Sequence, residues 1–309
     1  MKLMNAAKFV QTSVIVCTKD RMNSLTNLLE SLANQTIKPD EVIIVDASHN
    51  NDTKKMLDEK SGQLPYDIVY KKASPGSARQ RNIGYALSRG KYLFFFDDDV
   101  VLDSGYIRII MDTFSELERV QLGGITGRIM NVGPSPNIWE SLFKRLFFLS
   151  DFGSGKIKLS GFPSLRIDNV ASYVGVLSGC NMAFPKHIFS QFMFDEALTG
   201  YSYMEDVDLS FRVAKEFLLY YQPKAKLEHL TTTYKTVDTR MMRKMMARNH
   251  FYLFRKNLPK NLPNIFAFIM SIVGMLLYNG LAMKDIRACI GIVEGILKPL
   301  KLGENPEPA

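Results

Sequence analysis

The sequence predicts an α/β protein with a mostly parallel central sheet flanked by helices, followed by a helical C-terminal tail. Three observations support this class. Four strand-like runs alternate with helical segments in the first hundred residues, as in chains that connect parallel strands through helices. Polar and acidic residues follow several of these runs, where such sheets form their binding crevice. The last quarter of the chain is basic and apolar instead.

The expected strands are short and rich in β-branched or aromatic residues, and the expected helices have apolar residues three or four positions apart. In chain order they are a strand at Ser13–Cys17, a helix at Asn23–Ala33, a strand at Glu41–Asp46, a helix at Thr53–Lys60, a strand at Ile68–Lys71, a helix at Ser77–Ser88 and a strand at Tyr92–Phe96. Further strands are expected at Gly124–Met130 and near Gly179–Phe184.

Between these last two strands, Gly133–Ser164 is punctuated by Pro and Gly and contains the aromatic, amphipathic segment Trp139–Leu149. We expect that segment to be a helix that packs on the core. The alternative is a segment that touches a membrane or an acceptor.

The positive charge of the chain is local. The net charge is +8, and Lys235–Lys260 alone has eight basic residues against one acidic residue. The remainder is therefore nearly neutral, and we expect no nucleic-acid partner.

The C-terminal region has three apolar helical segments. Arg240–Asn257 is a basic amphipathic helix, Asn264–Met283 has twenty residues without a charge, and Ile286–Leu297 is a second apolar run. Twenty uncharged residues are about the length that crosses a bilayer. Three interpretations stay open: an interfacial hairpin on the membrane, a true span, or a core or oligomer helix. The adjacent basic residues suit anionic lipid, or an acceptor that carries a lipid diphosphate.

The cysteines and the N-terminus suggest a reducing compartment. Cys17, Cys180 and Cys289 lie far apart without metal-ligand spacing, so we expect free thiols in the cytosol. Residues 1–11 have no apolar run of the kind found in secretion signals, so we expect no secretion signal.

Three consecutive carboxylates, Asp97, Asp98 and Asp99, follow a run of phenylalanines at the end of a predicted buried strand. Partly buried, they would repel one another without a counter-charge. Mg²⁺ or Mn²⁺ takes such oxygen ligands and shares them with substrate phosphates, so we predict a divalent metal here rather than a solvated acidic turn.

A second acidic group, Glu205 and Asp206, starts a predicted helix. Acids are favoured in a first helical turn by the helix dipole alone. Asp206 is nevertheless our candidate for a general base. His229 is either a histidine whose hydrogen bonds are satisfied at a strand end or a metal ligand.

Six motifs in order resemble the inverting family 2 glycosyltransferases of the GT-A fold. They are VIVCTKDR, EVIIVDAS, SARQRNIGYALSRGKYLFFFDDDVVL, SGCNMAFPKHIF with FDEAL, YMEDVDLSFRVAK and LEHL, which together span Ser13 to Leu230.

The resemblance implies roles for residues of this chain. Thr18 and Asp46 would contact the nucleoside, and Arg79 or Arg81 would face the diphosphate or ribose. Val100 stands where many members have a further acid, so the main metal ligand could be Asp98 or Asp99. The expected donor-binding set is Thr18, Asp20, Arg21, Asp46, Arg79, Arg81, Asp97 and Asp98; the metal set is Asp97, Asp99 and His229; and the catalytic pair is Asp206 and Glu205.

The resemblance also implies a function. We expect a Mn²⁺- or Mg²⁺-dependent, inverting transfer of a sugar from a UDP or dTDP sugar to a glycan or lipid-linked acceptor in surface-polysaccharide synthesis, at the cytoplasmic membrane face. The catalytic domain would be residues 1–234, divided into a nucleotide-binding half at about 11–130 and an acceptor-side half at 131–234, and the tail would be 235–309. The chain could form oligomers. The alternatives are a sugar-phosphate nucleotidyltransferase, although no glycine-rich loop follows the first strand, and a non-enzymatic module that binds membrane or nucleic acid.

Overall fold

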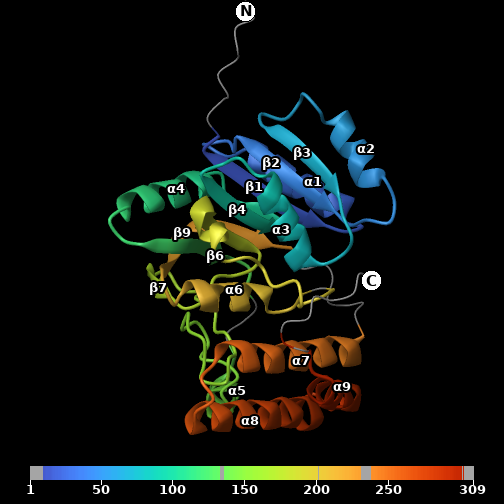
Figure 1. Ribbon diagram of the computed structural model, residues 1–309, viewed down its shortest axis with the longest axis vertical. Coiled ribbons are helices and arrows are strands. Elements are labelled where there is room, and N and C mark those ends of the chain that lie inside the picture. Colours follow the sequence, from blue (N-terminus) through green and yellow to red (C-terminus); the bar gives the residue numbers. More distant parts are fainter. Residues whose placement is uncertain (1–9, 133–135, 201, 231–237, 301, 303–309) are drawn as a thin grey trace, which may run out of the picture.

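The computed structural model describes residues 10–132, 136–200, 202–230, 238–300 and 302. A nine-stranded sheet with helices on both faces forms the larger part of the molecule, and four helices gather at its other end (Figure 1). The predicted α/β class is confirmed.

The first third of the chain forms one side of the sheet as predicted, with boundaries that differ by no more than one residue. Its strands are parallel, in the order β3-β2-β1-β4. The elements are β1 (Thr12–Thr18), α1 (Met22–Ala33), β2 (Glu41–Asp46), α2 (Asp52–Glu59), β3 (Asp67–Lys72), α3 (Ser77–Leu87) and β4 (Tyr92–Asp97).

Beyond β4 the sheet is mixed. The order continues β4-β8-β6-β9-β5, and β8 is antiparallel to both of its neighbours. The predicted strands β6 (Leu122–Ile129) and β8 (Asn181–Pro185) are confirmed. Elements that the sequence analysis did not identify are β5 (Val100–Leu102), α4 (Tyr106–Glu116), β7 (Ser172–Val174), the 3₁₀ helix η1 (Lys186–Ser190) and β9 (Leu218–His229).

The apolar core has two layers, one on each face of the sheet. On one face, Val14 and Val16 of β1 pack with side chains of α1, α2 and α4. On the other, Ile15 packs with Ala78 of α3 and with Leu209 of α6 (Glu205–Val213). Side chains alternate between faces along a strand, so each short β-branched run supplies both layers. The polar ends of these strands are thereby held at one rim.

Helices α7 (Thr239–Asn257), α8 (Leu262–Leu277) and α9 (Ile286–Leu297) follow, with α8 continuing as a π-helical turn, η2 (Tyr278–Ala282). All three predicted tail helices are confirmed. Helix α7 packs against both α6 and α9, and Lys256 pairs with Asp195 at 2.6 Å and with Asp208 at 2.9 Å. The predicted boundary between residues 234 and 235 lies outside the described residues.

The prediction that Trp139–Leu149 packs on the core is correct only at the end of the segment, where Leu149 packs against the core cluster that contains Ala247 and Met275. Helix α5 (Ile138–Leu146) has no buried residue, and Trp139 is 79% exposed. The helix instead lies against the end of α8: the rings of Phe143 and Tyr278 are 6.1 Å apart, and Tyr278 donates a hydrogen bond to Glu140. Amphipathicity predicted the helix correctly, but not which partner its apolar residues would meet.

The contact between α7 and α9 depends on a glycine. A Cβ atom on Gly295 would lie 2.9 Å from the backbone nitrogen of Arg248 and closer still to the carbonyl oxygen of Lys244. Neither backbone atom can move without shifting α7, so only a residue without a side chain permits this close approach.

We therefore expect Gly295→Ala to lower the free energy of unfolding by about 1–3 kcal/mol, the usual cost of overpacking. Urea denaturation followed by circular dichroism measures it. The control is Gly280→Ala, whose Cβ would meet only Cys289 Sγ at 3.4 Å. Equal stability of the two variants would contradict the proposed close packing.

Candidate active site

A cleft of about 730 Å³ opens at the carboxyl ends of β1 and β4. The starts of α3 and α6 and the loop before β8 form its walls, and α7 contributes two methionines. The predicted site residues that line the cleft are Thr18, Arg21, Arg81, Asp97, Asp98, Asp99, Glu205, Asp206 and His229. Parallel strands that end together thus bring most of the predicted site into one place.

Asp97, Asp99 and His229 form a cluster that can hold a metal ion. One ligand atom from each lies within 4.8 Å of the others. His229 reaches the acidic residues because β9 pairs with β5 so that His229 is opposite Val100. Its Nε2 is 3.0 Å from Asp99 Oδ1. Two carboxylates and one imidazole are a suitable donor set for Mn²⁺, and the carboxylates also suit Mg²⁺.

Asp98 has a different environment from its neighbours. It is buried, and its carboxylate accepts hydrogen bonds from Thr18 Oγ1 at 2.7 Å and Arg21 Nη1 at 2.9 Å. Burial raises the pKa of Asp98 to about 7, against the opposing charge of Arg21. Asp98 is not part of the metal-competent cluster. The sequence left open whether Asp98 or Asp99 is the main metal ligand, and the geometry favours Asp99.

Arg81 is the buried cation at the centre of the site. It is 3% exposed, and Nη2 lies 2.9 Å from Asp97 Oδ1 and 3.0 Å from the carbonyl oxygen of Gly179. Its Nη1 forms an ion pair with Glu205. Burial would lower the pKa of Arg81, but the charges of Glu205 and Asp97 outweigh it and keep the guanidinium protonated. Arg79, the other candidate, is exposed and does not line the cleft.

Asp206 faces the cleft from the first turn of α6. The residue that precedes the helix, Met204, has a φ of 73°, a left-handed conformation that is costly for a side chain of this size. Asp206 accepts hydrogen bonds from the backbone N–H groups of Gly179, at 2.8 Å, and Val207, at 2.9 Å. A Cβ on Gly179 would lie 3.0 Å from Asp206 Oδ2, so the glycine permits this contact. Burial raises the pKa of Asp206, and the charge of Arg81 opposes the shift.

Besides Arg79, two further predicted donor-binding residues, Asp20 and Asp46, do not line the cleft. Asp46 is buried and accepts hydrogen bonds from the Ser48 N–H at 2.7 Å and the Tyr70 hydroxyl at 2.8 Å. Asp20 accepts from the His49 N–H and lies 2.7 Å from His49 Nδ1. The roles predicted for both therefore stay predictions.

The structure also brings residues into the cleft that the sequence analysis did not identify. Gln80 donates hydrogen bonds to the carbonyl oxygens of Thr18, at 3.2 Å, and Val45, at 2.8 Å, and so joins the ends of β1 and β2. Met242 and Met245 of α7 line the opposite side. The helical periodicity of α7 was visible in the sequence, but nothing there indicated that it would form a wall of the active site.

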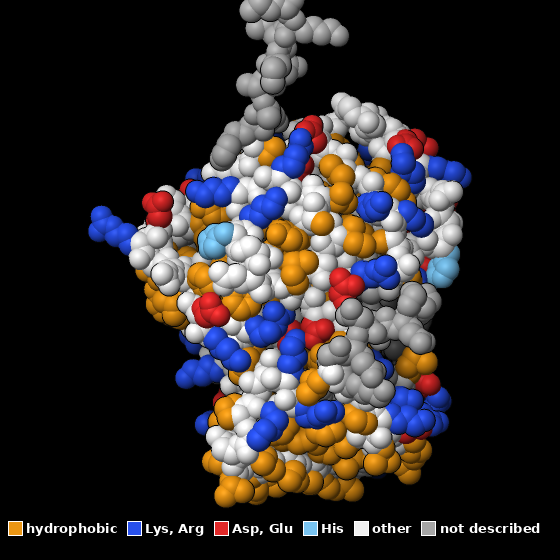
Figure 2. All heavy atoms as spheres, viewed as in Figure 1, with side chains coloured by type: hydrophobic (Ala, Val, Ile, Leu, Met, Phe, Trp, Pro, Cys, Tyr) orange, Lys and Arg blue, Asp and Glu red, His pale blue; other side chains and the backbone are white. Residues whose placement is uncertain are grey.

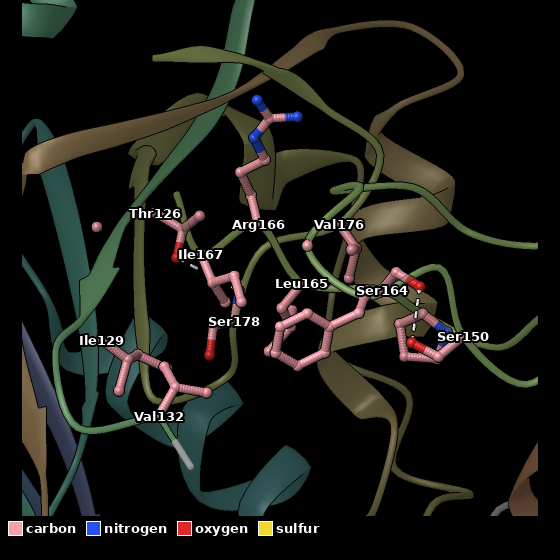
Figure 3. Close-up of a pocket in the computed structure, with 14 residues that line it drawn as sticks. Thr126, Ile129, Val132, Ser150, Ser164, Leu165, Arg166, Ile167, Val176 and Ser178 are labelled. Atoms are coloured by element: carbon pink, nitrogen blue, oxygen red, sulfur yellow. Dashed lines mark hydrogen bonds between the residues drawn. The ribbon is translucent and has the colours of Figure 1, made fainter. Parts of the chain in front are cut away.

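A smaller cavity of about 230 Å³ adjoins the cleft and shares Ile129, Pro163, Leu165 and Ser178 with it. Its walls come from the end of β6 and from the segment around residues 150–167, and Figure 3 shows Leu165, Ile167 and Val176 among its labelled side chains. The hydroxyl groups of Ser150 and Ser164 are 3.2 Å apart at one side of it. This side cavity extends the space available to a substrate beyond the acidic cluster.

Comparisons with known proteins agree with this geometry. Residues 13–192, more than half of the chain, match the family described as glycosyl transferase family 2. An uncharacterized glycosyltransferase of Haemophilus influenzae is 37% identical over 87 residues, which are 28% of this chain and 29% of that protein. The GalNAc(5)-diNAcBac-PP-undecaprenol beta-1,3-glucosyltransferase of Campylobacter jejuni is 31% identical over 109 residues, 34% of each chain. The matched region thus covers about a third of these relatives.

Two solved structures have a similar fold. GalNAc-T7 with UDP, GalNAc and Mn²⁺ aligns with a TM-score of 0.57 at 13% identity, covering 90% of this chain and 58% of that one. Staphylococcus aureus TarS with UDP-GlcNAc aligns with a TM-score of 0.52 at 16% identity, covering 92% and 79%. The architecture is that of the GT-A transferases, and with the match over residues 13–192 it follows that this chain belongs to glycosyl transferase family 2.

Proposed function

We propose that the protein transfers a sugar from a nucleoside-diphosphate sugar to a hydroxyl group of a glycan or lipid-linked acceptor, in the synthesis of a surface polysaccharide. The observation that carries the proposal is that a metal-competent cluster and an available carboxylate face the same cleft. The cleft volume of about 730 Å³ is also within the range of small-molecule binding sites, which is about 300–1,000 Å³. The name of the Campylobacter jejuni relative describes a transfer of this kind to a lipid-linked glycan.

The donor in this proposal is a UDP or dTDP sugar. Both structural neighbours contain UDP or a UDP sugar. Asp97, Asp99 and His229 would hold Mn²⁺ or Mg²⁺, which would neutralise charge on the diphosphate as it leaves. Thr18 and Arg21, at the end of β1, line the adjacent part of the cleft.

Asp206 is the proposed general base. The other cleft carboxylates, at residues 97, 98, 99 and 205, are all in ion pairs within the described residues. Asp206 is held by backbone N–H groups, which orient it and stabilise its ionised form. Glu205 acts instead as a positioning residue, because its carboxylate pairs with Arg81.

The reaction then needs one displacement. Asp206 accepts the proton of the acceptor hydroxyl, and the hydroxyl oxygen forms a bond to the anomeric carbon. The bond from that carbon to the diphosphate oxygen breaks on the opposite face, and its electron pair leaves with the nucleoside diphosphate. The configuration inverts through an oxocarbenium-like transition state. Among the described residues Asp206 is the cleft carboxylate without an ion pair, which suits this direct route.

Replacing Asp206 tests the base. We expect Asp206→Asn to lower kcat by about 10²–10⁴, the usual contribution of a general base, with donor affinity preserved. Release of nucleoside diphosphate from a panel of UDP and dTDP sugars, with a membrane extract as the source of acceptor, gives the rate. Asp58→Asn, on the exposed side of α2, is the matched control and should retain full activity. Unchanged turnover in Asp206→Asn would exclude this base, and no release from any donor would exclude the proposed function.

The metal ligands are tested by direct Mn²⁺ binding. We expect Asp99→Asn and His229→Gln each to weaken Mn²⁺ binding at least about tenfold, as measured by electron paramagnetic resonance of the free ion. Asp98→Asn is the comparison, since Asp98 is held by Thr18 and Arg21, and it should retain the affinity of the wild type. The assignment fails if Asp98→Asn weakens Mn²⁺ binding as much as Asp99→Asn does.

A further inference from the structure

One end of the molecule exposes large apolar side chains that the proposed function does not use. They recur at helical spacing, so each helix turns one unburied stripe outward. Leu262 is 83% exposed and Leu297 is 74% exposed. We call this set the apolar face: Ile138, Trp139, Leu142 and Leu146 of α5; Leu262, Ile265, Phe266, Ile269, Val273 and Leu277 of α8; Leu281 and Met283 at η2; and Ile286, Ile290, Val293 and Leu297 of α9.

Helix α8 is not enclosed as the core helix of a soluble protein would be. The segment Leu262–Ala282 is apolar and long enough to cross a membrane, yet only 33% of its most apolar stretch is buried. Monomeric soluble proteins rarely expose contiguous apolar patches of more than a few hundred Å². A surface of this kind is therefore expected to be covered by something else.

Charge indicates what covers it. Residues 240–298 contain ten basic and two acidic residues, a net +8 that equals the charge of the whole chain. Figure 2 shows a concentration of hydrophobic side chains at the bottom, over α8, with Lys and Arg in a band above. The two acids are engaged within the protein: Glu294 pairs with Arg240, and Asp285 caps α9. Arg145, Lys260, Lys284, Arg287 and Lys298 are exposed beside the apolar stripes.

We propose that the apolar face is a bilayer-binding surface, on which α5, α8 and α9 lie in the interface of an anionic membrane without crossing it. An apolar stripe flanked by basic residues is the pattern that such interfaces bind. A crossing α8 would turn its inner side toward lipid, and that side contains buried Asn264, Ser271 and Asn279. It would also have to leave Phe254, whose ring stacks on Phe268 at 4.4 Å.

The cleft lies close to the apolar face. Helix α7 separates the two: Gly295 of α9 packs against its backbone on one side, and its Met242 and Met245 line the cleft on the other. Lys256 and Asn257 fix α7 to Asp208 of α6, two residues after the proposed base. The active site is therefore one helix layer from the bilayer. An acceptor anchored in lipid would therefore reach the cleft. This consequence rests on the proposed function, whereas the binding to a bilayer does not.

Trp139 is the chain's single tryptophan, so intrinsic fluorescence reports directly on the apolar face. We expect its emission to shift to shorter wavelength when the full-length protein meets phosphatidylglycerol-containing vesicles, and brominated acyl chains to quench it. The protein should bind phosphatidylcholine vesicles at least about tenfold more weakly, since Lys and Arg beside the interface are attracted to an anionic surface and not to a neutral one. An unshifted spectrum with anionic vesicles overturns the proposal.

Vesicle flotation provides a second measurement with matched variants. Phe266→Glu with Ile269→Glu removes two apolar groups of the face, and binding should fall at least about tenfold. Ile37→Glu with Val170→Glu changes two exposed apolar residues away from the face, and flotation should persist. The proposal is overturned if the protein does not float and light scattering shows a dimer that Phe266→Glu with Ile269→Glu dissociates. In that case a second copy of the chain covers the apolar face. Neither assay needs a donor, so loss of the proposed function would leave both readable.

Discussion

The buried charge of Arg81 is the interaction on which the rest of the site depends. It holds Asp97 at the end of β4, Glu205 at the start of α6 and the carbonyl oxygen of Gly179 before β8. Taking the guanidinium and the Glu205 carboxylate out of water costs several kcal/mol per ion, and this is recovered only when all partners are in place. The three segments are therefore fixed relative to one another, and they bring the metal-competent cluster and Asp206 into the same cleft.

The same balance of charge explains how three consecutive aspartates coexist. Arg81 pairs with the first, Arg21 bridges the second and third, and His229 contacts the third. Asp98 turns toward Thr18 and is used to join β4 to β1. Asp97 and Asp99 are left near His229, where a divalent cation would complete the neutralisation. The triplet thus combines a structural carboxylate with two that suit a metal.

Much of this could be predicted from the sequence because β1, β2 and β4 are local, strongly apolar runs whose ends must meet. The rest depends on tertiary packing. β9 contains Pro223, Lys224 and Lys226, and its alternating burial becomes evident only once β6 and β5 are paired with it. Arg79 and Arg81 are two positions apart on α3 and point in different directions, but which one turns inward depends on where α6 lies. For the same reason, α5 showed its amphipathic pattern without showing that its apolar stripe would stay exposed.

In the proposed reaction, the cleft binds a nucleoside diphosphate through a metal held by Asp97, Asp99 and His229. Calorimetric titration of UDP and dTDP into the full-length protein, with Mn²⁺ and then with a chelator in its place, tests it most directly. We expect at least one nucleotide to bind, and this binding to require Mn²⁺ and to be lost in Asp99→Asn. Equal affinity with and without Mn²⁺, or no binding of either nucleotide under both conditions, would contradict it.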